Sequence, residues 1–211
     1  MAFLKKKFYF YRNISFKQLF HSKRLISMNK ELRKVVILLA HPNLKDSLAN
    51  KALVDTVKDI EGVAVFNLYE HQEGTFDIDE WSKVISEASS IIFQFPFHWM
   101  AAPSLLKRWQ DEVFTFLSKT PAVAGKPLLV VTTTGSEHEA YRSGGRNRFT
   151  TDELLRPYQV SAIHSGMNWQ TPIVIYGMST NDAGRNIAEG ATLYKQKVES
   201  LVDHSNAGNN W

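Results

Sequence analysis

The sequence of 211 residues contains no cysteine. This absence excludes disulfide bonds, thiolate metal ligands and cysteine nucleophiles. The sequence also lacks any run that approaches the roughly 20 apolar residues needed by a membrane-spanning helix. Its seven histidines are not spaced as a pair one helical turn apart, so we do not expect a helical metal site.

Glycine-rich signatures are missing as well. The chain has neither a Walker loop nor the G-x-G-x-x-G fingerprint of dinucleotide-binding domains. It also lacks the G-x-S-x-G nucleophile elbow, which leaves a hydrolase with little support. Any site for a phosphate-bearing ligand must therefore be built without a glycine-rich loop.

Acidic residues are absent from the first 30 residues, which hold eight lysines and arginines. The rest of the chain holds 17 basic and 21 acidic residues, although the net charge of the whole chain is +4. The part that we expect to fold is therefore mildly acidic. Because nucleic-acid phosphates bind to basic surfaces, nucleic acid is not an expected partner.

Residues 1–27 are basic and aromatic, and three interpretations of them stay open. They could be a transit-like presequence, a membrane-surface arm, or sequence upstream of a true start at Met28. We expect this segment to be an N-terminal extension that is disordered or not native. Residues 28–211 are expected to form one folded domain.

After Lys34 the sequence alternates between apolar runs and helical patterns. The near-continuous apolar runs predict strands of a parallel sheet that is covered on both faces. These runs are residues 35–40, 63–68, 90–95, 128–133 and 171–177. The helical patterns cover residues 47–60, 80–88, the stretch "SLLKRWQDEVFTFL" after Pro103, a segment capped by Thr151 or Asp152, and residues 182–202.

This alternation predicts an α/β fold, a flavodoxin-like three-layer sandwich with a five-stranded parallel sheet of order 2-1-3-4-5. In such sheets, ligands bind at the carboxyl ends of the strands, at the switch point between strands one and three. The loops that follow strands one, three and four are therefore the candidate site.

The first of these loops reads "HPNLKDSLAN" and leads into a helix. The free N–H groups and positive dipole end of a helix suit a phosphate. His41 and Ser47 could add hydrogen-bond donors. The alternative is a plain N-cap, in which Asp46 or Ser47 caps the helix and His41 is an ordinary loop residue.

The other two loops are aromatic and hydroxyl-rich. The loop after strand three, "PFHWM", is expected to pack on a flat ligand or a partner chain, or alternatively on the rest of the monomer. The loop after strand four begins "TTGS" and continues to Tyr141. Its hydroxyls and N–H groups could face a heterocycle, with Gly135 allowing close approach, or the loop could simply be solvated and charged.

Taken in this order, these loops resemble those of the flavodoxin-like NAD(P)H:quinone oxidoreductases. The stretches that carry the resemblance are "AHPNLKDSLAN", "FPFHWMAAPSLLKRWQDEVF", "TTTGSEHEAYRSGGRNRFTTDELLRPYQ" and "GMNWQTPIVIYG". The likeness covers about residues 34–202 and is greatest to the short bacterial branch. That branch includes general-stress NAD(P)H oxidoreductases and the ancillary quinone reductases of glutathione-gated potassium efflux channels.

The resemblance implies a flavin site. The first loop would hold the flavin phosphate, the aromatic loop would lie along the isoalloxazine and ribityl, and the "TTGS" turn would bond to the pyrimidine edge. The implied cofactor-binding residues are His41, Ser47, Leu48, Ala49, Asn50, Pro96, Phe97, His98, Trp99, Thr133, Thr134, Gly135 and Ser136.

The resemblance also implies catalytic residues. The N–H of Gly135 would stabilise negative charge on the reduced flavin, and Tyr141 would polarise the quinone oxygen or supply a proton. In the mammalian relatives a histidine follows this tyrosine by six residues. Here the position is Asn147, which puts a Tyr/His relay in doubt, although His138 is nearby in the same loop.

The implied activity is that of an NAD(P)H dehydrogenase (quinone). Two electrons would pass from NAD(P)H to quinones or similar acceptors by a ping-pong hydride mechanism, with FMN, or alternatively FAD, as the cofactor. The family implies a cytoplasmic homodimer with its site at the interface, and its ancillary members imply association with a potassium efflux system at the inner membrane. The alternative function is a flavin-binding regulatory subunit of such a channel. A one-electron flavodoxin is disfavoured, because "HPNLKDS" replaces the Ser/Thr/Gly-rich phosphate loop.

Overall fold

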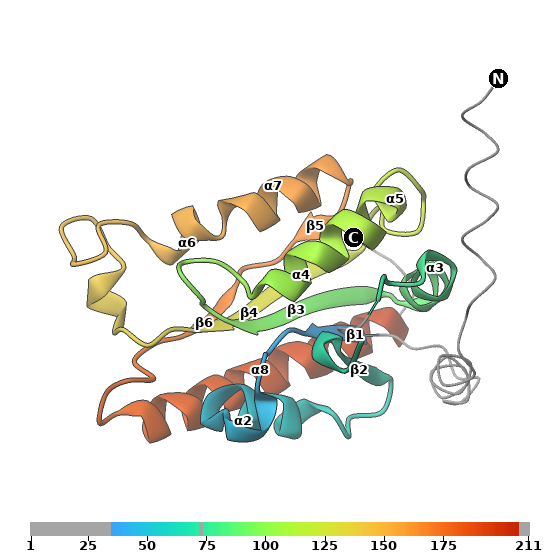
Figure 1. The fold of residues 1–211 in the computed structure, drawn as a ribbon. Coiled ribbons are helices and arrows are strands. Elements are labelled where there is room, and N and C mark those ends of the chain that lie inside the picture. The colour runs from blue at the N-terminus through green and yellow to red at the C-terminus, as the bar shows by residue number, and fades with distance from the viewer. Residues whose placement is uncertain (1–34, 72–73, 207–211) are drawn as a thin grey trace. The chain divides into compact units, whose positions relative to one another are not determined.

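The computed structural model describes residues 35–71 and 74–206, with side chains for 35–70 and 74–204. The extension expected at residues 1–27 lies outside this part of the chain, so its three interpretations are not tested. The described residues form a sheet with helices on both faces (Figure 1). The strands are β1 (Val35–Leu39), β2 (Val63–Asn67), β3 (Ser90–Pro96), β4 (Pro127–Thr133), β5 (Asn168–Trp169) and β6 (Ile173–Ile175).

The sheet confirms the predicted order. The neighbours run β2-β1-β3-β4-β5, β6 also pairs with β4, and every pairing is parallel. The strand predicted at 171–177 is shorter, Ile173–Ile175, and a second short strand, β5, precedes it along the same edge of β4. Pro172 lies between them, and proline cannot donate a hydrogen bond to a sheet ladder.

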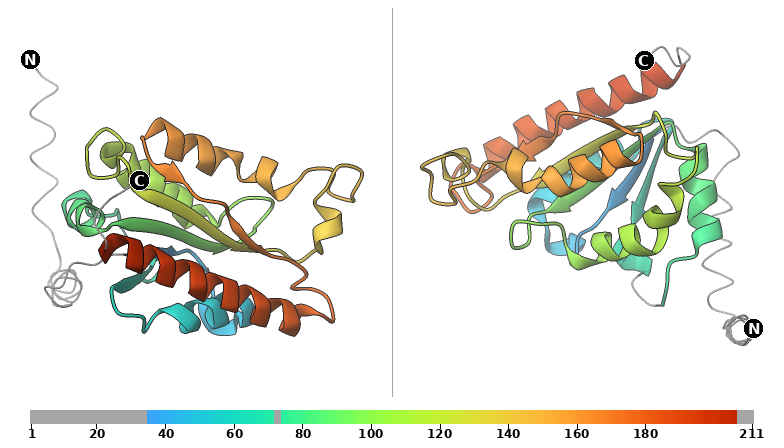
Figure 2. Two further views of the ribbon diagram at one scale, coloured as in Figure 1. Left: turned by 180° about the vertical axis from the view of Figure 1, so that it is seen from behind. Right: turned by 90° about the horizontal axis from the view of Figure 1, so that it is seen from above.

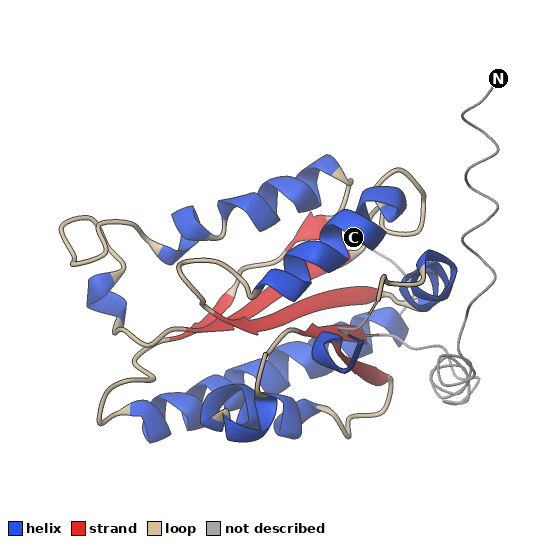
Figure 3. Cartoon of the chain, viewed as in Figure 1, coloured by secondary structure: helices blue, strands red, loops and turns tan. Residues whose placement is uncertain are grey.

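Helices occupy both sides of this sheet (Figure 3). The α-helices are α2 (Leu48–Val57), α3 (Ile78–Glu87), α4 (Ser104–Trp109), α5 (Thr115–Leu117), α6 (Thr151–Leu154), α7 (Arg156–His164) and α8 (Ala183–Asn206). A π-helical turn, η3 (Gln110–Phe114), joins α4 to α5. Three short 3-10 turns are η1 (Leu44–Asp46), η2 (Leu68–His71) and η4 (His138–Ala140).

Two of these helices, α2 and α8, lie together on one face of the sheet, whereas α4 and α7 lie on the other face (Figures 1 and 2). The core under α2 and α8 is aliphatic, and Tyr194 of α8 is fully buried within it. On the other face, the indole of Trp109 packs edge-on against Trp81 and Phe93, with ring centroids 5.5 and 6.0 Å apart. These two cores hold the strands so that their carboxyl ends share one edge.

One detail of the sequence prediction was wrong. We expected Thr151 or Asp152 to cap the helix now called α6, but Thr150 is the cap. Its hydroxyl accepts a hydrogen bond from the N–H of Glu153 at 3.2 Å, and the Glu153 carboxylate accepts one from the N–H of Thr150 at 2.8 Å. This reciprocal capping box satisfies two N–H groups at once, which a cap one residue later would not do.

Close packing between α8 and β6 depends on a glycine. A Cβ atom at Gly190 would lie 2.4 Å from Cγ1 of Ile175, a side chain that is itself buried. Real Cβ atoms do not approach other carbons so closely, so α8 sits on β6 only because this residue has no side chain.

Replacing Gly190 with alanine should therefore destabilise the fold. We expect the free energy of unfolding to fall by about 1–3 kcal/mol, the usual cost of overpacking a core. Gly184→Ala is the matched control, because Gly184 lies in the same helix and a Cβ atom there would have no neighbour within 4 Å. Urea unfolding would measure both variants, and equal stabilities of the two would contradict this account of the packing.

Candidate functional site at the carboxyl edge of the sheet

The start of α2 lies in the first predicted loop. The hydroxyl of Ser47 caps the helix by accepting a hydrogen bond from the N–H of Asn50 at 3.1 Å. Asp46 does not cap it, since its carboxylate binds the side-chain amide of Asn43. The N–H groups of Leu48 and Ala49 come first in the helix and have no intrahelical acceptor. Ser47 is therefore the N-cap that the sequence offered as the alternative, and two N–H groups of the first turn are left without an intrahelical acceptor, as an anion site requires.

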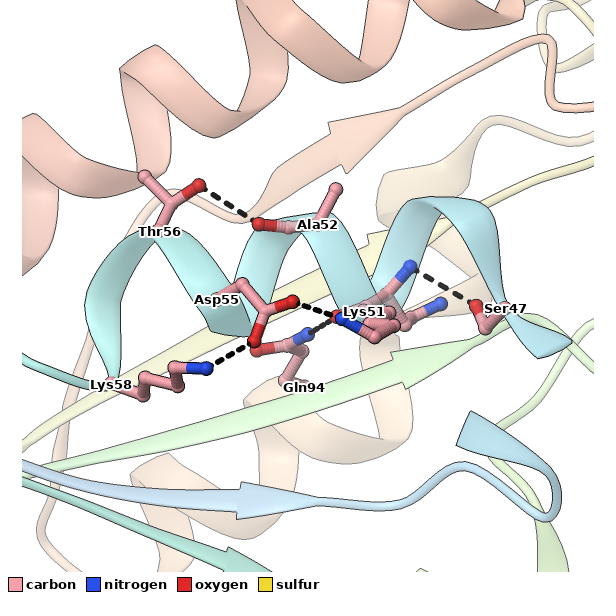
Figure 4. A network of polar contacts seen from close by, with 8 residues as sticks. Ser47, Lys51, Ala52, Asp55, Thr56, Lys58 and Gln94 are labelled. Carbon is pink, nitrogen blue, oxygen red and sulfur yellow. Dashed lines mark hydrogen bonds and ion pairs between the residues drawn. The ribbon is translucent and has the colours of Figure 1, made fainter. Parts of the chain in front are cut away.

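Asn50 connects this helix to the sheet. Its side chain is only 1% exposed, and its Nδ2 donates to Oγ1 of Thr133 on β4 at 3.0 Å. The amide of Gln94 on β3 donates to the Asn50 carbonyl at 3.0 Å, and the Tyr194 hydroxyl donates to the Gln94 side chain at 3.2 Å. Figure 4 shows Ser47 at the start of α2 and Gln94 reaching from β3 toward this helix. One buried polar network thus joins α2, β3, β4 and α8.

The same network contains one polar atom without a partner. Among the described residues, Oδ1 of Asn50 is buried and accepts no hydrogen bond. An unpaired buried acceptor costs free energy of order 1–3 kcal/mol, so it calls for a donor from outside the chain, either a ligand or an ordered water.

The loops after β1 and β3 meet at two histidines. Burial lowers the pKa of His41, and the charge of the nearby His98 lowers that pKa further. Nδ1 of His41 accepts a hydrogen bond from the N–H of Asn43 at 3.1 Å. A neutral His41 ring therefore carries its proton on Nε2, where it can be donated to a ligand.

The aromatic loop after β3 forms a tight turn. The backbones of His98 and Ala101 exchange hydrogen bonds of 2.8 and 3.1 Å, and the two residues between them, Trp99 and Met100, both have positive φ angles of 49° and 63°. Such turns usually contain glycine or asparagine, because other side chains are strained there. Trp99 is 97% exposed at the tip, so it does not pack on its own chain. Of the two expected arrangements, this exposure favours a ligand or a partner chain.

The turn after β4 uses most of its side chains internally. Thr133 accepts from Asn50, the Thr134 hydroxyl donates to the Ser136 carbonyl at 2.8 Å, and the Ser136 hydroxyl accepts from Arg146. A Cβ at Gly135 would lie 2.9 Å from Oγ of Ser179. Each hydroxyl of this turn thus has one partner within the chain, while the O–H groups of Thr133 and Ser136, which only accept in these bonds, can still donate to a ligand.

Tyr141 and His138 both lie beside a residue that the sequence interpretation missed. The Tyr141 side chain is 5% exposed, and its ring centroid is 6.3 Å from that of Phe97 and 5.9 Å from that of Tyr176. The exposed His138 ring stands 5.0 Å from Tyr176 at 89°. We read Tyr176 as part of an apolar strand. Its place directly after the carboxyl end of β6 was the signal that could have identified it.

The structure therefore brings most of the predicted residues to the carboxyl edge of the sheet, although some of their side chains are exposed to solvent. Contacts between Asn50 and Thr133, between Phe97 and Tyr141, and from the Phe97 N–H to the Thr133 carbonyl at 2.9 Å join the three loops. By contrast, Leu48 is 84% exposed and, like Trp99, points away from the packed residues. In the described part of the chain, no three His, Asp or Glu side chains are placed to hold a metal ion, and no helix could cross a membrane.

A separate groove of about 440 Å³ runs between β6 and α8. Of the predicted site residues only His138 lines it, together with Tyr176, Ile175, Arg185 and other residues of the same elements. This groove is not the predicted flavin site, because no residue of the loops after β1 and β3 reaches it.

The buried hydrogen bond between Asn50 and Thr133 yields a matched pair of variants. Thr133→Val keeps the shape but leaves the Asn50 amide unpaired, so the free energy of unfolding should fall by about 1–3 kcal/mol. Thr132→Val should leave it unchanged or raise it, because the buried Thr132 hydroxyl has no partner among the described residues. Denaturant unfolding of both variants tests the difference, and similar losses for the two would argue against the network.

The comparisons with known proteins agree with this architecture. A family model described as "Flavodoxin-like fold" matches residues 33–198. The chain is 36% identical over 183 residues to the glutathione-regulated potassium-efflux system ancillary protein KefG of Serratia proteamaculans (strain 568), which covers 84% of this chain and 92% of that protein.

Two solved structures are also similar. General stress protein 14 from Treponema denticola, in complex with FMN, superposes with a TM-score of 0.74 and 29% identity over 80% of this chain and 99% of that one. The NADPH-quinone reductase from P. pentosaceus has a TM-score of 0.67 and 25% identity over 78% of this chain and 96% of that one. The chain therefore belongs to the flavodoxin-like fold family, in which it is related to KefG, to general stress protein 14 and to the NAD(P)H:quinone reductases.

Proposed function

We propose that this protein is an FMN-dependent NAD(P)H dehydrogenase that reduces quinones or similar acceptors. The observation that carries the proposal is the carboxyl edge itself. There, the uncapped N–H groups of α2 and a buried acceptor on Asn50 lie at the start of one helix, and an exposed aromatic loop follows the neighbouring strand β3. The similar structure of general stress protein 14 contains FMN, and a similar NADPH-quinone reductase supports the reaction.

The residues present fit a flavin mononucleotide. Its phosphate suits the start of α2, where the N–H groups of Leu48 and Ala49 and the Ser47 hydroxyl would hold it. A ribityl hydroxyl would supply the donor that Oδ1 of Asn50 lacks. FMN is favoured over FAD because the similar structure of general stress protein 14 holds FMN.

Other residues would orient the flavin and the acceptor. Pro96, Phe97 and His98 would flank the ring system, and the backbone of Thr133, Thr134, Gly135 and Ser136 would meet its polar edge. The bound flavin would supply the two-electron chemistry between NAD(P)H and the acceptor. The preorganised backbone N–H of Gly135 would favour negative charge on that edge.

Tyr141 would hold or donate a proton at the acceptor oxygen. His138 is exposed, and among the described residues no hydrogen bond joins its side chain to that of Tyr141, which weakens a direct relay between the two. Asn147 does not replace the missing histidine in the relay either. Its N–H donates to the Ala140 carbonyl at 2.9 Å, which closes the loop on itself.

A homodimer would explain the aromatic loop. Trp99 is almost fully exposed on a turn with two strained φ angles, and burying this indole against a second copy would remove apolar surface from water. The proposed dimer would therefore complete the site with residues of the partner.

A second function is supported by the similarity to KefG. The name of that relative connects it with a glutathione-regulated potassium efflux system. We propose as the alternative that this chain is a flavin-binding ancillary subunit of such a channel, located in the cytoplasm and bound peripherally at the inner membrane. Flavin binding with negligible turnover, together with capture of a potassium channel from membranes, would favour this role.

Purification tests the proposed activity. The protein should be yellow, release one FMN per chain on denaturation, and oxidise NADPH when menadione is added. The absorbance spectrum, the mass of the released flavin and the rate of NADPH oxidation are the measurements. A colourless protein that binds neither added FMN nor added FAD would overturn the proposal.

Ser47 gives a sharper test of the phosphate site. Ser47→Asp should keep the helix cap but repel the phosphate, lowering FMN affinity by roughly tenfold or more. Ser47→Asn is the matched control, because asparagine caps as well as aspartate but carries no charge. Flavin content after purification, with unfolding midpoints for both variants, measures the difference. Full flavin loading of the aspartate variant would place the phosphate elsewhere.

A further inference from the structure

Tyr176 joins three segments that are distant in the sequence. Its ring lies 5.9 Å from Tyr141 and 5.0 Å, edge to face, from His138, both in the loop after β4. Its hydroxyl shares a hydrogen bond of 2.6 Å with Oγ1 of Thr151 on α6. The Tyr176 carbonyl accepts a further bond from Asn186 at 2.9 Å, so the backbone is held as well as the ring.

The loop after β4 needs such an anchor. Within itself it is closed by backbone bonds from Gly145 to the Arg142 carbonyl at 2.9 Å and from Arg148 to the Gly145 carbonyl at 3.0 Å. Its first residues are tied by backbone hydrogen bonds to residues 177–179, directly after Tyr176. Farther along, the Tyr141 ring packs against Phe97 and Tyr176, and these ring contacts attach this part of the loop to the sheet.

The hydrogen bond to Thr151 fixes the Tyr176 ring rather than merely burying it. Thr151 is 6% exposed and stands at the first position of α6. Burial raises the pKa of Tyr176, so the phenol stays protonated at neutral pH and the bond joins two neutral hydroxyls. A phenylalanine would keep the ring contacts and lose only this restraint.

We propose that Tyr176, held by Thr151, is a positioning residue that orients Tyr141 toward the acceptor. This inference rests on the proposed function, because it assigns Tyr176 a role in the step that Tyr141 serves. Tyr176 acts through Tyr141 and is not itself a catalytic residue. We therefore expect loss of the Tyr176 hydroxyl to slow the oxidation of the reduced enzyme by the acceptor, and to leave the rate of its reduction by NADPH unchanged.

A first experiment needs no bound flavin. Arg142, Arg146 and Arg148 are exposed trypsin sites in the loop that Tyr176 anchors. Tyr176→Leu should make trypsin cleave this loop faster, while Tyr69→Leu, at a half-buried tyrosine elsewhere, should not. Mass spectrometry of the fragments locates the cuts. Unchanged cleavage of the loop in the Tyr176 variant would overturn the anchoring role.

A second experiment separates positioning from structure. Tyr176→Phe and Thr151→Val should each slow oxidation by menadione roughly tenfold, less than the 10²–10⁴-fold that a lost general acid costs. Reduction by NADPH and FMN affinity should not change. In a Tyr141→Phe background, the additional effect of Tyr176→Phe should vanish, because residues that act through one another are not additive.

The outcomes distinguish the two proposals. If Tyr176→Phe slows both half-reactions equally, or slows acceptor reduction equally with and without the Tyr141 hydroxyl, Tyr176 does not work through Tyr141 and the inference fails. If the parent protein reduces no acceptor, the proposed function fails, and the trypsin result still decides whether Tyr176 anchors the loop.

Discussion

The buried hydrogen bond between Asn50 and Thr133 is the contact on which the rest of the site depends. It ties the first turn of α2 to the carboxyl end of β4, two segments that are 83 residues apart in the sequence. Gln94 of β3 donates a further hydrogen bond to the Asn50 carbonyl. These bonds connect α2, β3 and β4, so the loops at their ends are held together. A polar network in a low-dielectric interior is costly unless it is satisfied, and this one is satisfied except at Oδ1 of Asn50. The single open acceptor lies where the proposed ligand would bind.

Contacts between aromatic rings connect the loops beyond this hydrogen-bond network. Phe97 follows directly from β3 and packs against Tyr141, which in turn packs against Tyr176 after β6. The row of rings couples the loop after β3 to the loop after β4 and to the edge strand. Trp99, in the same loop as Phe97, stands outside this row, and its exposure leaves an apolar surface that a ligand or a second copy can cover.

The fold could be predicted largely from local patterns. Apolar runs predicted the strands, and the rule that parallel sheets bind ligands at a switch point selected three loops that the structure brings together. What failed was local detail that depends on side-chain geometry. The capping box makes Thr150 the N-cap of α6, and the last strand begins only after Pro172, because each of these details depends on single hydrogen bonds. The sequence also did not reveal that Asn50, read as a cofactor-binding residue, ties α2 to β4 through its side-chain amide. Tyr176 was missed because an aromatic residue at the end of an apolar run looks like core until its neighbours from distant segments are known.

The proposed site depends on the start of α2 binding the phosphate of a flavin mononucleotide. Comparing the affinities of the flavin-free protein for FMN and for riboflavin, which lacks the phosphate, tests it most directly by fluorescence titration. Charge-assisted hydrogen bonds are worth about 1.5–3 kcal/mol each, so FMN should bind roughly a hundredfold tighter or more. Equal affinities for FMN and riboflavin would contradict the account.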